Sequence, residues 1–218
     1  MLKLYPLISR FYVWEMRNLA KEVLQDELSE ALDGIMSKKD EVRSDSFRIL
    51  KRISEEQPNA LYPKWDYLAD LLNGDNHFHR YISINLLANL AKIDVKNKFE
   101  TIFDEYFSNI EGERTMVAGQ AALNSGKIAK AKPKLQPKIT NRLLNIEKTH
   151  QGKQIELIKA YVIEAFSEYF EESLDKNKIL DFVRAQLESK SPKTRKVARE
   201  FLKKESCKNL DPKAKRIK

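Results

Sequence analysis

One helix-pair pattern occurs twice between residues 40 and 110, and this repetition constrains the fold more than any other feature of the sequence. In the first copy, apolar or small residues recur three and four positions apart, as on the buried face of an amphipathic helix. The stripe of the expected first helix is Val42, Ser46, Ile49, Leu50 and Ile53. After a polar break, the expected second helix carries Leu61, Trp65, Leu68, Ala69 and Leu72. Gly74 then suits a left-handed backbone position that ends this helix.

The second copy follows at a shift of 37 residues for the first helix and 38 for the second. In the first helix, the residues that correspond at this shift are Arg43 and Arg80, Ser46 and Ser83, Leu50 and Leu87, and Ile53 and Leu90. The second maps Leu61, Trp65, Leu68 and Leu72 onto Phe99, Phe103, Tyr106 and Ile110. A fixed period carried by two amphipathic helices is typical of stacked solenoids. We therefore expect residues 40–110 to form four helices, arranged as two stacked antiparallel pairs without a strand.

These residues resemble a known repeat family. The run Glu41-Val42-Arg43 with Ser46, Leu50 and Ile53 is similar to the first helix of a HEAT repeat, as is His79-Arg80 with Ser83, Leu87 and Leu90. The period is slightly shorter than the roughly 40–47 residues usual for that class. The resemblance implies an all-α fold, an α-α superhelix of about five helix pairs. It also implies that the second helices of the pairs line the concave surface.

Weaker copies of the pattern continue toward the C-terminus. We expect a third unit over residues 111–149 and a fourth over 150–190. A restart follows at Ser191, a candidate N-cap, with Pro192 at the first helical position. Small residues on the first helix of the third unit predict a close approach to its neighbour: Ala118, Ala121 and Ala122.

The expected domain organisation is a single solenoid over residues 1–206. Residues 1–37 would form atypical capping helices, because a terminal repeat turns one face to solvent. Residues 207–218 are rich in lysine and lack apolar periodicity, which predicts a basic, disordered tail.

Charge is distributed unevenly along the chain. The formal net charge is +8. Residues 1–112 hold 15 Lys/Arg and 19 Asp/Glu, a net charge of −4, whereas residues 113–218 hold 25 and 13, a net charge of +12. An asymmetry of this kind suggests a partner surface in the second half.

The strongest candidate for that surface is residues 114–146, which contain seven cations and no acidic residue. Lys134, Lys138 and Arg142 are spaced by four, so they would line one strip of the third unit's second helix. The earlier second helices carry acidic residues instead, namely Asp66, Asp70, Glu100 and Asp104. The predicted partner-binding residues are Lys134, Lys138, Arg142, Lys127, Lys130 and Lys132.

Three interpretations of these cations stay open. They can form an ordinary solvated face of a lysine-rich protein. They can bind an acidic segment of a protein partner. They can also contact nucleic-acid phosphates, which requires clustered cations along a groove.

The sequence carries no catalytic motif that we recognise. It has no glycine-rich phosphate loop, no His-Glu-x-x-His and no Gly-x-Ser-x-Gly. The lone cysteine, Cys207, has no evident base nearby, and its ordinary interpretation is an inert thiol. His77, His79 and His150 lack the spacing of metal ligands. We expect no cofactor, no metal and no small-molecule substrate.

One enzyme family shares the expected architecture. The HEAT-like alkylpurine DNA glycosylases are helical, basic and of similar length, and they use a groove tryptophan followed one turn later by an aspartate. In this sequence Trp65 is followed at that spacing by Ala69, and Trp14 by Asn18. Neither tryptophan matches the family's spacing, and the place of Trp65 in the apolar stripe favours core packing.

The sequence thus predicts a non-catalytic scaffold or adaptor that binds a protein partner through an elongated helical-repeat surface with a basic second half. The alternative is a nucleic-acid-binding HEAT-like module or, less favoured, a DNA glycosylase. No signal peptide and no run of about 18 apolar residues is evident, so we expect a cytoplasmic protein without a membrane span. The sequence does not indicate an oligomeric state.

Overall fold

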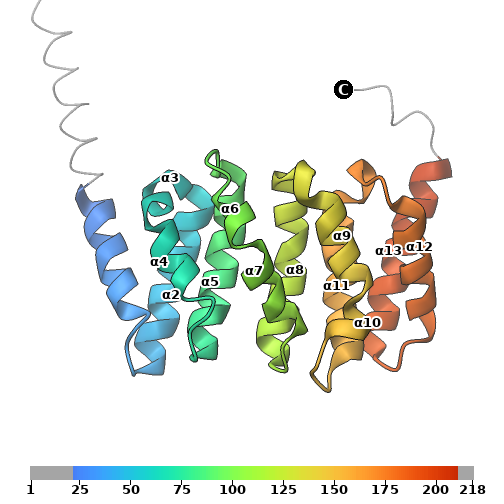
Figure 1. Ribbon diagram of the computed structural model, residues 1–218, viewed down its shortest axis with the longest axis horizontal. Coiled ribbons are helices and arrows are strands. Elements are labelled where there is room, and N and C mark those ends of the chain that lie inside the picture. The colour runs from blue at the N-terminus through green and yellow to red at the C-terminus, as the bar shows by residue number, and fades with distance from the viewer. Residues whose placement is uncertain (1–21, 211–218) are drawn as a thin grey trace, which may run out of the picture. The chain divides into compact units, whose positions relative to one another are not determined.

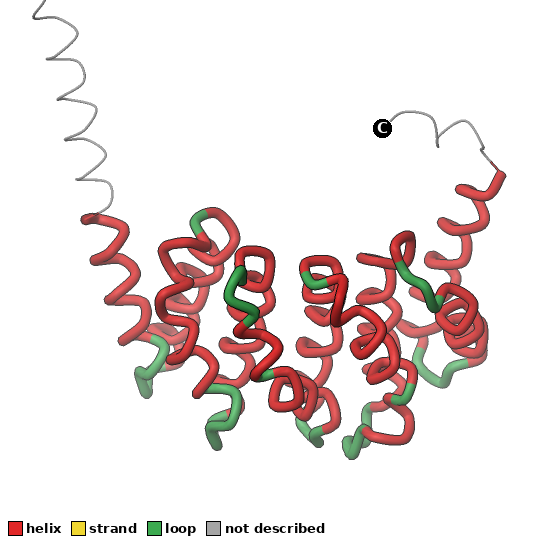
Figure 2. The backbone as a smooth tube through the Cα atoms, turned by 45° about the horizontal axis from the view of Figure 1, so that its top comes forward, coloured by secondary structure: helices red, strands yellow, loops and turns green. Residues whose placement is uncertain are grey.

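The computed structural model describes residues 22–210, and for residues 207–210 it describes the backbone alone (Figure 1). The chain divides into two compact units, Met1–Trp65 and Asp66–Lys218, and each is described by itself below. The described residues contain helices, turns and loops but no strand (Figure 2). The fold is therefore an all-α helical-repeat fold, as the repeat pattern predicts.

The described part of the first unit has a helical segment over residues 22–34, followed by α2 (Asp40–Glu56), α3 (Pro58–Leu61) and the 3-10 helix η1 (Tyr62–Lys64). Helix α2 packs against α3. Leu50, Ile53, Leu61 and Trp65 are all buried, as predicted. Val42 is an exception, because it is 40% exposed and contributes little to the core. Residues 1–21 of the predicted capping helices lie outside the described residues.

The second unit is built on a row of long first helices. These are α5 (His77–Leu90), α8 (Thr115–Ala131), α11 (Ile155–Tyr169) and α13 (Pro192–Leu210). Consecutive members of the row pack against each other, α5 on α8, α8 on α11 and α11 on α13. The third and fourth helix-pair repeats predicted from the sequence, residues 111–149 and 150–190, thus match successive helix pairs of this compact unit. Helix α13 runs four residues into the predicted tail, and residues 211–218 lie outside the described part.

The second helices form the other layer of this unit (Figure 1) and are broken into short pieces. The first is α4 (Trp65–Asp70), which begins at the last residue of the first unit. It is followed by α6 (Lys98–Thr101) with α7 (Phe103–Glu111), then by α9 (Gln136–Leu144) with α10 (Ile146–Thr149), and then by α12 (Lys176–Ala185). Short 3-10 helices join the layers: η2 (Ala91–Ile93), η3 (Pro133–Leu135), η4 (Phe170–Glu172) and η5 (Gln186–Glu188). The apolar stripe still predicts the buried positions, since Leu68, Phe99, Phe103, Tyr106, Ile139 and Leu143 are all buried.

The arginine that recurs at the start of the first helices has a structural role that the pattern did not reveal. Arg43 donates to the carbonyl of Ser37, Arg80 to that of Gly74, and Arg195 to that of Ser189, at 2.8, 2.6 and 2.6 Å. In each case the acceptor lies six residues earlier in the connecting loop. The arginine thereby ties the loop to the helix that follows it, which explains why this residue recurs.

Two local predictions about helix ends have opposite outcomes. The Ser191 hydroxyl accepts a hydrogen bond from the backbone N–H of Thr194 at 3.3 Å, and Pro192 is the first residue of α13, so the predicted N-cap is confirmed. The left-handed position predicted for Gly74 is wrong, because no described glycine has a positive φ. Asn97, with φ of 53°, adopts that conformation instead, immediately before α6.

Helix α8 lies very close to α11, as its small residues predict. Ala118, Ala121 and Ala122 are fully buried. The closest approach occurs at glycines, however. A Cβ atom at Gly126 would lie 2.6 Å from the carbonyl oxygen of Ala165, and one at Gly119 would lie 2.8 Å from the ring of Tyr161.

Candidate partner-binding surfaces

The six predicted partner-binding cations lie on the third helix pair. Lys127 and Lys130 belong to α8, and Lys132 is its C-terminal cap. Lys134 lies in η3, and Lys138 and Arg142 lie on α9. The structure therefore places all six on adjacent elements, but their surroundings differ widely.

The two cations on α9 face acidic residues of the preceding repeat. Arg142 forms ion pairs with Asp104 and Glu111 of α7, both at 2.6 Å. Burial works against the charge on Arg142, but its hydrogen bonds to Glu111 and Asp104 raise its pKa above the ordinary value. Lys138 is 3.5 Å from Asp104, and its ammonium group lies 3.8 Å from the centre of the Phe103 ring. The predicted ridge is thus largely neutralised within the fold.

Lys132 is a structural residue. Its side chain is only 8% exposed, and its ammonium group lies 2.8 Å from both the carboxylate and the backbone carbonyl of Asp94. It also contacts Asn97 at 3.1 Å and Glu100 at 3.4 Å. Asp94 in turn accepts the backbone N–H groups of Lys98 and Phe99. Lys132 therefore neutralises a carboxylate that caps α6, and a partner could not reach it without disrupting that cap.

Lys127 and Lys130 are exposed but also have partners. Lys127 donates to the side-chain carbonyl of Asn89 on α5 at 2.9 Å. Lys130 lies 3.9 Å from a carboxylate oxygen of Glu168 on α11. The Lys130–Glu168 pair is exposed on both sides and contributes little to stability. Both lysine side chains are exposed, so both stay accessible to solvent and to a partner.

Several of these pairs share one pattern, although the Lys130–Glu168 pair runs the other way. In this pattern, an acidic residue of one repeat pairs with a basic residue of the next repeat along the chain. Asp66 pairs with Lys98 at 2.8 Å, and the Asp94–Lys132 and Asp104–Arg142 pairs both join residues 38 positions apart. The excess of basic residues in the second half thus compensates, in part, for the acidic residues that precede it.

Lys134 differs from the other five cations. It is exposed, and it has no hydrogen bond or ion pair with any residue in the described part of the chain. It lines a cavity of about 250 Å³ together with Pro133, Glu100 and Val95. Val95 lies in the turn of the preceding helix pair and is 85% exposed. An unpaired cation and an exposed apolar side chain therefore flank the same hollow.

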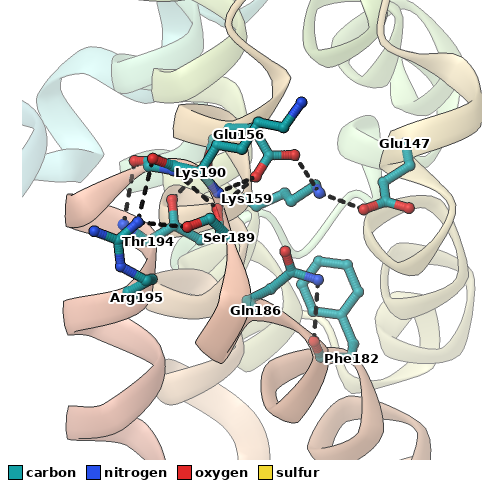
Figure 3. Close-up of polar contacts among 10 residues, drawn as sticks. Glu147, Glu156, Lys159, Phe182, Gln186, Ser189, Lys190, Thr194 and Arg195 are labelled. Carbon is teal, nitrogen blue, oxygen red and sulfur yellow. Dashed lines mark hydrogen bonds and ion pairs between the residues drawn. The ribbon is translucent and has the colours of Figure 1, made fainter.

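A second polar cluster joins α10, α11 and the start of α13 (Figure 3). The Glu156 carboxylate accepts hydrogen bonds from Lys159 at 2.6 Å and from the hydroxyl of Ser189, and Lys159 also pairs with Glu147. The hydrogen bonds from Lys159 and Ser189 lower the pKa of Glu156. Burial works against the charge on Lys159, but Glu147 and Glu156 together raise its pKa. A lysine nucleophile needs the opposite shift, so the arrangement fits a structural junction.

Trp65 and the described histidines are not arranged as a base-stacking or metal-binding site. Trp65 is 1% exposed and contacts Tyr62, so its ring is not available to stack on a base. The Nδ1 atom of His150 lies 2.8 Å from the carbonyl oxygen of Ile110, which anchors the loop before α11. Among the described side chains, those of residues 22–206, no group of His, Cys, Asp and Glu has the geometry of a metal site. In the same residues, no helix is both long enough and apolar enough to span a membrane.

Comparison with known proteins adds little to these observations. The sequence matches no family model and no curated protein. A solved structure described as an engineered protein is 14% identical and covers 83% of this chain and 97% of its own, with a TM-score of 0.35. A score of that size bears on neither the fold nor the function of this chain.

Proposed function

We propose that this protein is a non-catalytic, HEAT-like scaffold or adaptor that holds a protein partner on the surface of its second unit. The observation that carries the proposal is the pairing of Val95 with Lys134 on one cavity. The exposed valine offers apolar contact area, and the unpaired lysine offers a charge that needs no internal ion pair to be broken. A protein segment with an apolar side chain beside a carboxylate matches both.

The same contacts argue against phosphate tracking as the main role. Binding along a nucleic-acid backbone needs several cations that can each release counterions. Lys132 is buried, and Arg142 and Lys138 are held by Asp104 and Glu111. The strip on α9 therefore offers a backbone much less free charge than its sequence suggests.

The test compares two variants on the cavity with two matched controls elsewhere. Lys134→Glu and Val95→Asp alter the proposed surface. Lys148→Glu makes the same charge change at an exposed lysine of α10, and Leu174→Asp makes the same apolar-to-acidic change at a 92% exposed leucine of another turn. All four positions are on the surface, so we expect melting temperatures close to that of the wild type.

The readout is the retention of copurifying proteins and of single- and double-stranded nucleic acid on the immobilised protein. We expect Lys134→Glu and Val95→Asp to lose the same protein partner while both controls keep it. Equal retention by all four variants would refute the proposed surface. Loss of nucleic acid alone, with a steep dependence on salt concentration, would instead support the nucleic-acid-binding alternative.

A further inference from the structure

A second cavity, of about 260 Å³, lies where the loop between α7 and α8 meets the start of α5. Two arginines line it, Arg80 of α5 and Arg114, which directly precedes α8. Glu113 contributes the cavity's acidic side chain, and Ser108 and Asn109 contribute neutral polar groups. The charged side chains around the hollow therefore sum to one positive charge.

The guanidinium group of Arg80 is oriented but only partly used. Its Nε donates to the carbonyl of Gly74 at 2.6 Å, which fixes the plane of the group. Its terminal Nη atoms have no hydrogen-bond or ion-pair partner among residues 22–210. Arg114 is exposed and likewise has no partner in the described part of the chain. Two cations thus line one cavity without a carboxylate bound to either.

The preceding repeat shows one way in which such an arginine is occupied. Arg43 is the equivalent of Arg80, and besides its bond to the loop carbonyl it forms an ion pair with Asp40, three residues earlier in its own helix. At Arg80 the residue three positions earlier is His77. The second repeat therefore keeps the loop-anchoring bond but lacks the internal carboxylate.

We propose that the cavity between Arg80 and Arg114 binds a single carboxylate of a peptide. The planar, forked donor set of arginine matches a carboxylate in a bidentate geometry. The net charge of the lining matches one negative charge, and the polar groups of Ser108 and Asn109 suit a polar ligand. The carboxylate can come from an acidic side chain or from a C-terminus. The inference rests on the proposed function only in assigning the peptide to a protein partner.

The binding test uses pentapeptides and the full chain. One peptide carries a central glutamate and blocked termini, a second is all glycine with a free C-terminus, and a third carries a central glutamine and blocked termini. Binding is followed through the Nε–H signals of Arg80 and Arg114 in NMR spectra at low salt. We expect saturable shifts with one of the two carboxylate peptides and none with the glutamine peptide, and the peptide that binds identifies the source of the carboxylate.

Variants of the residues that line the cavity should either weaken or strengthen binding of the peptide. Arg114→Gln should weaken binding by at least about tenfold, a factor that corresponds to 1.4 kcal/mol. The matched control is Arg199→Gln, at an exposed arginine of α13, and it should leave binding unchanged. Glu113→Gln should strengthen binding, because it removes a negative charge that repels the carboxylate of the peptide from the same cavity.

The comparison between repeats gives a further variant. His77→Asp should weaken peptide binding, because it supplies Arg80 with the internal carboxylate that Asp40 supplies to Arg43. The neutral control His77→Asn should not weaken it.

Three outcomes would overturn the assignment. One is the absence of saturation with both carboxylate peptides. A second is equal binding by Arg114→Gln and Arg199→Gln. The third is tighter binding of inorganic phosphate than of either peptide. Because Lys134 and Val95 line the other cavity, these results are independent of the pull-down with the Lys134 and Val95 variants, and either proposal can fail alone.

Discussion

Replacing Gly126 by alanine tests the contact between α8 and α11 directly. The added Cβ atom would lie 2.6 Å from the carbonyl oxygen of Ala165 and 2.9 Å from its Cα, and both are backbone atoms of α11. Because backbone atoms of a packed helix cannot move alone, the two helices must separate or tilt to accommodate the methyl group.

Two opposing terms set the size of the effect. Alanine in a helix interior is favoured over glycine by about 1 kcal/mol. Overpacking a well-packed interface costs about 1–3 kcal/mol, and more when the backbone must shift. Because backbone atoms of α11 must shift, the cost should lie in the upper part of this range, about 2–3 kcal/mol. Subtracting the gain in helix propensity, we expect Gly126→Ala to lower the free energy of unfolding by about 1–2 kcal/mol. For a chain of this size, each kcal/mol corresponds to a shift in Tm of about 2–4 °C.

Gly119→Ala is the matched comparison on the same helix. Its Cβ would meet the ring of Tyr161 at 2.8 Å, and this partly exposed side chain can shift at the cost of its contact with the Lys193 ammonium group, which lies 3.7 Å from the ring centre. The gain in helix propensity should then offset most of the cost, so we expect a change close to zero. Urea titration of both variants, followed by circular dichroism, measures the difference. A Gly126→Ala protein as stable as the wild type would refute the close backbone contact.

Three further predictions concern the core and the ion pairs. Leu87 is fully buried, and Leu87→Ala should lower the free energy of unfolding by about 2–5 kcal/mol in urea titration; a loss below about 0.5 kcal/mol would place it outside the core. Arg142→Glu should lower the Tm while Lys134→Glu leaves it unchanged, because only Arg142 faces two carboxylates, and equal Tm values would contradict the ion pairs. The pKa of Glu156 is lowered, so its charge stabilises the fold above the ordinary glutamate pKa of about 4.3, and this contribution is lost as the pH falls through the folded-state pKa. The stability difference between the wild type and Glu156→Gln should therefore be present at neutral pH and shrink on acidification, and a difference that does not change with pH would refute the role of the charge.

The sequence pointed to a basic segment that includes Lys134, but it gave neither Val95 on the same cavity nor the surroundings of the other cations. The segment over 114–146 was found because it lacks acidic residues, yet the carboxylates that neutralise it belong to the preceding repeat. A signal for this was present, since Asp94 and Asp104 precede Lys132 and Arg142 by one repeat period of 38 residues. Charge summed over a segment hides such pairs, whereas charge compared at the repeat period reveals them. The cavity between Arg80 and Arg114 gave no such signal, because its two arginines come from different repeats and have no motif in common.

The sequence by itself determined the helix pairs, their period and most of the buried positions. These follow from the spacing of apolar residues, because residues on one face of a helix recur at a fixed interval and each repeat carries the same pattern. Leu50 and Leu87, or Trp65 and Phe103, are buried for this reason.

Only the tertiary structure decided which charges are free. The position of a residue in the repeat pattern determines which face of its own helix it occupies. The free energy of its charge depends on what lies opposite it on a neighbouring repeat. Lys132 and Lys134 are two residues apart, and one is buried against Asp94 while the other has no partner among the described residues. The same reason applies at the interface of α8 and α11, where glycines rather than the predicted alanines allow the closest approach, because a neighbour's backbone decides how much space a side chain has.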